Sequence, residues 1–132
     1  MCIRDRSSTD ASHEEDVAIG RTLTPHLLDS GFTAIFCFND MLAIGALLAC
    51  RERGIAVPQE VSVVGFDDIK MADYVIPPLT TIHQPKFLLG SLATEMLLDL
   101  LNGRPVRNHV LSPTLKLRAS TACCYEVKSE SI

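Results

Sequence analysis

The stretch Val61-Ser-Val-Val-Gly-Phe-Asp-Asp68 decides the fold, together with Ile76-Pro-Pro-Leu-Thr-Thr-Ile-His-Gln-Pro85 shortly after it. The first stretch is rich in β-branched residues and ends in two carboxylates, which predicts a central strand with polar groups at its carboxyl end. The second stretch has prolines near both ends, which predicts a stiff extended crossing that ends in the amide of Gln84. Ligands of open α/β sheets bind beyond the carboxyl ends of the strands, so both stretches indicate a ligand site.

Helices and strands alternate on both sides of these stretches. The spacing of apolar residues predicts one helix after Ser12, a second from Asp40 to Gly54 and a third from about Lys86 to Asn102. Strands are predicted over residues 33–38 and 61–66, with two short extended segments near 106–111 and 115–118. This alternation is typical of an α/β fold in which a parallel sheet is covered by helices on both faces.

Local signals predict where these helices begin and end. Ser12 and Glu15 form a capping-box pattern at the start of the first helix, which Pro25 is expected to kink or divide. Asp40 is expected to cap the second helix, with Asn39 as the other candidate for that cap. Glycines are expected to end the three helices: Gly31, Gly54 and Gly103.

Composition allows a packed domain and excludes two kinds of partner. The chain has 132 residues, 47% of them hydrophobic, which suits one compact domain or part of a larger one. Its net charge is −4 and its basic residues are scattered, so it carries no electrostatic footprint for a phosphate backbone. No apolar run approaches the roughly 20 residues that span a bilayer, and we expect no membrane partner.

The sequence contains no pattern for catalysis, for a cofactor or for a metal. Its four histidines and five cysteines show no metal-ligand spacing, and free thiols at Cys37 and Cys50 suit the cytoplasm. A Gly-x-Gly-x-x-Gly turn, a phosphate loop and a nucleophile elbow are absent. We therefore expect a protein that is not an enzyme and that needs no cofactor.

Three motifs in a fixed order point to a known family. The order is Phe38-Asn-Asp40, then Gly65-Phe-Asp-Asp68, then Pro77-Pro-Leu-Thr-Thr-Ile-His-Gln84. It resembles the effector-sensing domain of the lactose-repressor (LacI/GalR) family of transcription regulators, over about residues 33–121. The resemblance implies a periplasmic-binding-protein-like (type I) fold, a parallel sheet flanked by helices, present here as an incomplete fragment.

The resemblance also divides the chain. Residues 12–121 would form the C-terminal part of the sensor domain, mostly its C-terminal lobe, with helix 86–102 belonging to the N-terminal lobe and residues 122–132 forming a tail. The segment Met1-Cys-Ile-Arg-Asp-Arg6 resembles a sequencing-library artefact, with a disordered native N-terminus as the alternative, and residues 1–11 are left out of the fold. We expect the native protein to begin upstream, where a DNA-binding headpiece would stand.

Four residues are the candidate effector contacts: Asn39, Asp67, Gln84 and Lys86. The first three match family positions that hydrogen-bond the effector, and a carboxylate or amide suits hydroxyl or amino groups. Each has a structural alternative: Asn39 as a helix cap, Asp67 as a turn cap and Gln84 bonded to the crossing backbone. At Lys86 some family members place an aromatic ring against the ligand, so a lysine indicates either an anionic effector or a solvated charge.

The resemblance implies a homodimer formed side by side through the C-terminal lobe. The expected contacts are Ile44, Leu47 and Cys50 on one helix, and Met71, Tyr74 and Val75 after the Asp-Asp pair. The helix is apolar nearly all round from Met41 to Cys50, more than one buried face requires. The alternative interpretation is that this helix is sandwiched in the core.

The most favoured function is the effector-sensing and dimerisation region of a cytoplasmic LacI-type regulator. Its effector would be a sugar, a sugar derivative or a purine, and operator DNA would be bound only through the absent headpiece. A fragment of a periplasmic solute (sugar) binding protein is the alternative, and a nucleotide-dependent enzyme is a third. The family works as a two-state switch, so this chain alone is expected to bind neither operator nor effector tightly.

Overall fold

The computed structural model describes residues 13–123, and the capping-box serine, the artefact segment and most of the tail lie outside them. Within these residues, three α-helices, a short 3-10 helix and four strands follow one another. Their bounds are α1 His13–Asp29, β1 Ala34–Phe36, α2 Asp40–Glu52, β2 Ser62–Asp67, η1 Lys70–Asp73, β3 Thr80–His83, α3 Lys86–Leu101 and β4 Thr114–Lys116. The predicted α/β class is confirmed.

The four strands form one sheet in the order β1-β2-β3-β4. β1, β2 and β3 are parallel, and β4 runs antiparallel to β3 at the edge. β1 is shorter than the predicted strand, although the Cys37 amide extends the ladder by donating to the Val64 carbonyl at 2.8 Å. The parallel register pairs Asp67 with His83, so the carboxyl ends of β2 and β3 finish side by side.

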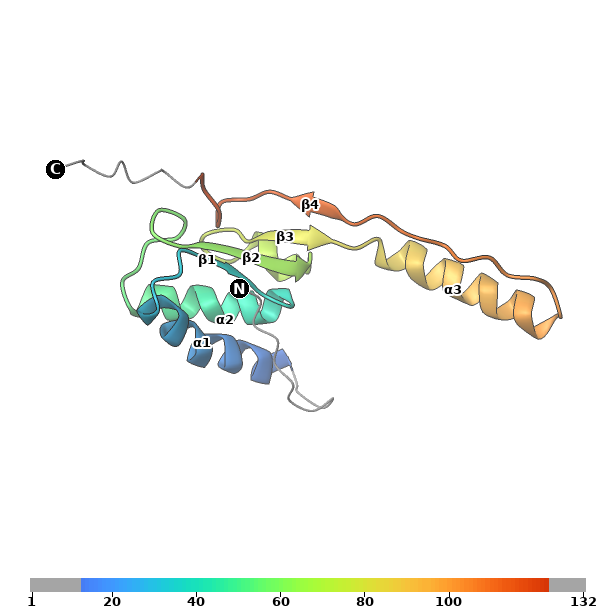
Figure 1. Ribbon diagram of the computed structural model, residues 1–132, viewed down its shortest axis with the longest axis horizontal. Helices are drawn as coiled ribbons and strands as arrows, with labels where there is room; N and C mark the ends of the chain where they lie inside the picture. Colours follow the sequence, from blue (N-terminus) through green and yellow to red (C-terminus); the bar gives the residue numbers. More distant parts are fainter. Residues whose placement is uncertain (1–12, 124–132) are drawn as a thin grey trace.

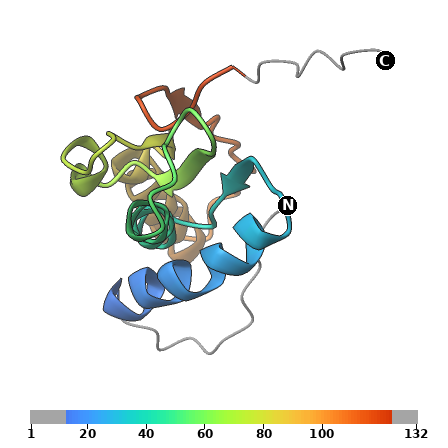
Figure 2. The ribbon, with the colours of Figure 1, turned by 90° about the vertical axis from the view of Figure 1, so that its left-hand side faces the viewer.

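α1 and α2 lie on the same side of the sheet (Figures 1 and 2). The prediction of helices on both faces was wrong for the described residues. The β1–α2–β2 crossover places α2 on one face, α1 packs along α2, and α3 points away from the sheet. Val63 of β2 is therefore buried under α2. Val64, the next residue of β2, and Phe36 of β1 remain partly exposed to solvent.

Glycines allow α1 and α2 to approach closely. A β-carbon at Gly20 would meet the Leu42 carbonyl, and one at Gly45 would meet the Val17 carbonyl. Thr24, one turn after Gly20, is buried and donates its hydroxyl hydrogen to the Gly20 carbonyl at 2.7 Å. Pro25 lies inside α1 without dividing it. The three glycines predicted to end helices all have positive φ, as expected.

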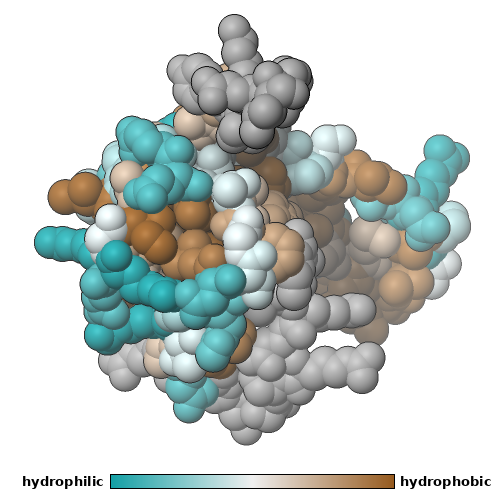
Figure 3. Space-filling view, turned by 60° about the vertical axis from the view of Figure 1, so that its left-hand side comes forward, coloured by the Kyte–Doolittle hydropathy of each residue, from teal (hydrophilic) through white to brown (hydrophobic). Residues whose placement is uncertain are grey.

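α3 forms an extended arm (Figure 1). No residue of this helix is buried, and Phe87 at its start is 91% exposed. In Figure 3 the distant part of the molecule, where α3 extends, shows much brown apolar surface. The apolar surface that the sequence predicts on this helix is present, and residues 13–123 leave it uncovered.

Candidate functional site

Asp67 and Gln84 meet at the carboxyl edge of the sheet. Gln84 Nε2 donates a hydrogen bond to Asp67 Oδ1 at 2.8 Å, and both side chains are half-buried. Asp67 ends β2 and Gln84 follows β3, so the parallel pairing of these strands brings them together. Asp67 has φ 113° and Asp68 has φ 52°, values that residues other than glycine seldom adopt. The backbone therefore turns sharply where the candidate contacts lie.

Asp68 points to a different set of partners. Its Oδ1 accepts from Arg118 Nη2 at 2.7 Å, and its Oδ2 lies 2.9 Å from His83 Nδ1. Burial alone would raise the pKa of this carboxyl group, but hydrogen bonds and charge from Arg118 and His83 outweigh burial and lower the pKa. Asp68 is thus held in its ionised form, and the positive charge of Arg118 balances its negative charge.

Arg118 joins the returning C-terminal segment to the sheet. Besides Asp68, its guanidinium contacts Asp73 Oδ1 at 2.7 Å and donates to the Leu79 carbonyl at 2.8 Å. Its backbone amide donates to Thr80 Oγ1 at 2.9 Å. No sequence motif pointed to this residue, because its partners are up to 50 positions away.

Asp40 is a buried carboxylate, and the prediction that it caps α2 was wrong. Asn39 is the cap, since its Oδ1 accepts from the Leu42 amide at 2.8 Å. Asp40 instead accepts from Thr81 Oγ1 at 2.5 Å and from the Ile69 amide at 2.8 Å. Burial raises its pKa, which these two hydrogen bonds only partly offset.

Asn39 lies at the same edge as Asp67 but is already engaged. While its Oδ1 caps α2, its Nδ2 donates to Asp16 Oδ2 on α1 at 2.9 Å. The amide thus has a structural role in this chain, the alternative that its sequence position allowed. Its contact with an effector stays a prediction, and an effector would have to compete with Asp16.

A cavity of about 250 Å³ adjoins Gln84. Its lining combines the ring of Phe66 with the polar groups of Gln84 and His109, and is completed by Pro85, Leu89, Leu111 and Pro113. A mostly apolar cavity with a few polar groups is the usual form of a small-molecule site. Neither Phe66 nor His109 was predicted as a residue of the site. The only available signals were the place of Phe66 near the end of a strand and that of His109 in the segment that returns to the sheet.

Lys86 is not brought to this cavity. It lies on the exposed surface of α3 beside Phe87 and Glu95, in a shallow depression formed by that helix alone. The structure thus unites Asp67 with Gln84, places Asn39 at the same edge and leaves Lys86 apart.

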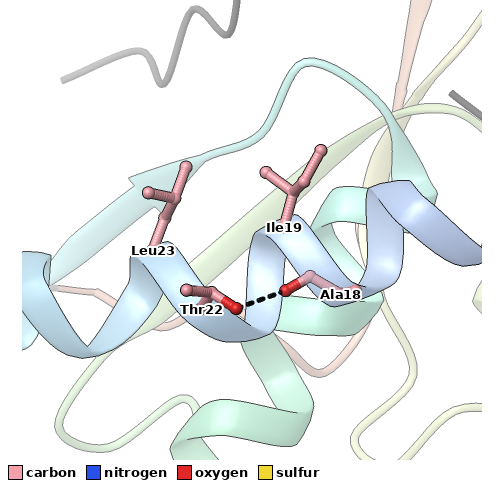
Figure 4. Close-up of a pocket in the computed structure, with 4 residues that line it drawn as sticks. All are labelled: Ala18, Ile19, Thr22 and Leu23. Atoms are coloured by element: carbon pink, nitrogen blue, oxygen red, sulfur yellow. Dashed lines mark hydrogen bonds between the residues drawn. The ribbon is translucent and has the colours of Figure 1, made fainter. Parts of the chain in front are cut away.

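A second depression lies on α1, with a volume of about 340 Å³. In Figure 4 its Ile19 and Leu23 side chains point to one side of the helix, and Thr22 Oγ1 donates to the Ala18 carbonyl at 2.8 Å. The Thr22 hydroxyl is therefore already bonded within α1, and the remaining lining is aliphatic. It offers little to orient a polar ligand.

The residues expected at a dimer contact fall into two groups. Ile44, Leu47 and Cys50 are buried within this chain, so the prediction of a surplus exposed face on α2 was wrong. α2 packs against both α1 and β2, and Leu47 belongs to the core cluster, which agrees with the alternative interpretation. Met71 and Tyr74 are exposed, and Val75 packs against the core. The dimer contact itself stays a prediction.

The described residues contain no group of three or more histidine, cysteine, aspartate or glutamate side chains that could hold a metal ion. None of the helices between residues 13 and 123 has the length and apolar character that a bilayer crossing requires.

A mostly parallel sheet with an aspartate–glutamine pair and a cavity beyond its strand ends defines an α/β ligand-binding domain. The family model of the periplasmic binding protein-like domain matches residues 2–121. The chain belongs to this family, and the resemblance to LacI-type sensor domains is confirmed by the relatives it matches.

Two curated relatives are transcriptional repressors. The HTH-type transcriptional repressor PurR of Vibrio atlanticus is 51% identical over 67 residues, which cover 51% of this chain and 20% of the relative. The ribose operon repressor of Haemophilus influenzae is 47% identical over 91 residues, covering 67% of this chain and 27% of the relative. This chain therefore spans about a quarter of the length of these relatives.

Two solved structures have the same fold. A LacI family transcriptional regulator from Enterococcus faecium with bound ribose has a TM-score of 0.72 at 38% identity, covering 78% of this chain and 39% of that one. The Lac repressor dimer bound to operator and an anti-inducer has a TM-score of 0.76 at 38% identity, with coverages of 83% and 39%.

Proposed function

We propose that this chain forms the effector-sensing and dimerisation part of a LacI-type DNA-binding transcriptional regulator. The observation that carries the proposal is the Asp67–Gln84 pair beside the cavity at the carboxyl edge of the sheet. The relatives support it, since they are repressors rather than enzymes or periplasmic solute-binding proteins. Operator binding belongs to a headpiece outside this chain, and the regulator acts in the cytoplasm.

The effector is a small polar molecule, and the chemistry of the edge favours a sugar or a sugar derivative. The carboxylate of Asp67 accepts two or more hydroxyl donors, while the Gln84 amide both donates and accepts. The Phe66 ring adds an apolar face of the kind that packs against a sugar ring or a purine base. The names of the ribose operon repressor and of the ribose-bound relative support a pentose as the first probe.

The regulator works as a homodimer, as the operator-bound Lac repressor does. In this chain the exposed candidates for the contact are Met71 and Tyr74, next to the effector edge in sequence. An effector that binds one arrangement of the dimer more tightly than another shifts the balance between them, and so changes operator affinity.

The test uses the complete reading frame that contains this sequence, titrated by calorimetry with D-ribose, other pentoses and hexoses, their phosphates and purine bases. Asp67→Asn is expected to weaken binding of the best probe at least about tenfold, since charge-assisted hydrogen bonds contribute about 1.5–3 kcal/mol each. The asparagine keeps an acceptor for Gln84, so folding stability should change little.

Asp29→Asn is the matched control, because Asp29 is an exposed carboxylate at the far end of α1. It should leave affinity unchanged. Equal losses of stability and of affinity in Asp67→Asn would make Asp67 a structural turn residue, and the absence of binding by every probe would refute the proposed function.

A further inference from the structure

We propose that Asp40, working with Thr81 and Gly65, is the positioning residue that holds the Asp67–Ile69 turn and so presents Asp67 to the effector. This inference rests on the proposed function of Asp67. Asp40 does not face the candidate cavity, so its role would be exerted through the backbone of the turn.

The hydrogen bonds of Asp40 end on that turn. Its Oδ2 accepts from the backbone amide of Ile69 at 2.8 Å. Its Oδ1 accepts from Thr81 Oγ1 at 2.5 Å, and the same hydroxyl oxygen accepts from the Asp68 amide at 3.4 Å. One carboxylate therefore fixes the Ile69 amide directly and the Asp68 amide through one intermediate. Both residues directly follow Asp67.

Gly65 provides the space for this carboxylate. A β-carbon built on Gly65 would overlap Asp40 Oδ1, and it would also lie 3.0 Å from Leu79 Cδ2. The Asp40 side chain thus lies against the bare backbone of β2, where only glycine leaves room. This contact gives a reason for the glycine in the Gly65-Phe-Asp-Asp68 motif that does not involve its own dihedral angles.

The turn needs such support. Asp67 and Asp68 both have positive φ, a conformation that costs free energy in residues with a β-carbon and persists where the surroundings enforce it. Asp40 holds the turn from the α2 side, and Arg118 holds the Asp68 carboxylate from the side of the returning segment. Between these two anchors, the Asp67 carboxylate points to Gln84.

Thr81→Val tests the inference, because valine keeps the shape of the buried threonine and removes only the hydroxyl. The first readout is nuclear magnetic resonance of the full chain without ligand. The Gln84 side-chain amide and the Asp67 backbone signals should move, and exchange of the Ile69 amide should speed up about tenfold. Gly65→Ala should move the same signals, and Thr81→Ser should restore them.

Thr24→Val is the matched control, since Thr24 is equally buried but bonds within α1. It should leave the signals of Asp67 and Gln84 unchanged. The second readout is calorimetry on the complete regulator with the best probe, for which Thr81→Val should weaken binding about tenfold and Thr24→Val less than twofold.

The two readouts separate the possible failures. Unchanged Asp67 and Gln84 signals in both Thr81→Val and Gly65→Ala would overturn the positioning role, whether or not the wild-type protein binds a probe. Signals that move while affinity stays constant would also overturn it. If no probe binds the wild-type protein, the proposed function fails.

Discussion

Arg118→Met is expected to destabilise this chain by about 3 kcal/mol at neutral pH. Methionine fills much of the same volume but removes the charge and all three guanidinium contacts. Those contacts join Asp68, Asp73 and the Leu79 carbonyl to the segment that follows β4. The substitution therefore tests whether one mostly covered cation ties the returning segment to the sheet.

The magnitude follows from burial. The side chains of Arg118 and Asp68 are only 15% and 13% exposed, so the variant leaves Asp68 desolvated with His83 as its remaining partner. Removing one member of a buried ion pair costs about 3–5 kcal/mol, and the residual exposure here places the effect at the lower end. The pair with Asp73 adds little, because that carboxylate is more than half exposed.

The effect should depend on pH in a defined direction. The pKa of Asp68 is lowered in the folded chain, so its ionised form stabilises the fold above the ordinary value of 3.8. This stability is lost as the pH falls through the folded pKa. The difference between the wild type and Arg118→Met should therefore be full at pH 7 and shrink below pH 3.8.

Urea denaturation followed by circular dichroism measures this difference. With a slope of about 1.5 kcal/mol per molar urea, the midpoint should fall by about 2 M. Arg53→Met is the control, since the pair of Arg53 with Asp29 is exposed and should contribute less than about 1 kcal/mol. If Arg118→Met does not fold, Arg118→Lys, which keeps the charge, is measured in its place. Its urea midpoint should fall by less than the roughly 2 M expected for Arg118→Met, at about 1.5 kcal/mol per molar urea, and by more than the midpoint of Arg53→Met. Equal midpoint shifts for Arg118→Met and Arg53→Met, or a shift independent of pH, would refute the reasoning.

Two further predictions concern α2 and its surroundings. Leu47→Glu should abolish folding rather than yield a folded monomer, because Leu47 is buried in this chain. Tyr74 is exposed, so Tyr74→Glu should leave a folded protein whose self-association, measured by sedimentation, is weakened. Gly45→Ala should destabilise the chain by about 1–3 kcal/mol, because the added β-carbon forces α1 and α2 apart near Val17. Gly90→Ala on exposed α3 should instead stabilise the chain by about 0.5–1 kcal/mol, since alanine favours a helix over glycine. Thermal midpoints of the two variants that shift in the same direction would contradict this account.

Much of the site could be predicted because it follows from chain order. Asp67 stands at the end of a predicted strand and Gln84 at the end of a predicted extended crossing, and the parallel pairing of β2 with β3 brings these two ends together. Periodicity likewise predicts α3 within one residue, since helix period and a terminal glycine are local properties.

The errors arose where tertiary contacts override local rules. Asp40 at the start of a helix is typical of a cap, yet its carboxylate is drawn inward by Thr81 and Ile69, which lie far away in sequence. The all-apolar character of α2 indicated an interface, but the second face is covered by α1. Arg118 was missed as a structural residue because no pattern in the sequence near it indicates its distant partners Asp68 and Asp73.

The two adjacent carboxylates of the motif have different partners, and we infer different roles from this difference. Asp68 faces a guanidinium and an imidazole, which lower its pKa and leave little of its charge for a ligand. Asp67 instead accepts a hydrogen bond from the neutral side-chain amide of Gln84, a partner that carries no positive charge. Both residues have positive φ and face different partners. The Asp68 carboxylate binds the domain together, and we propose that the Asp67 carboxylate is the one offered to a polyol.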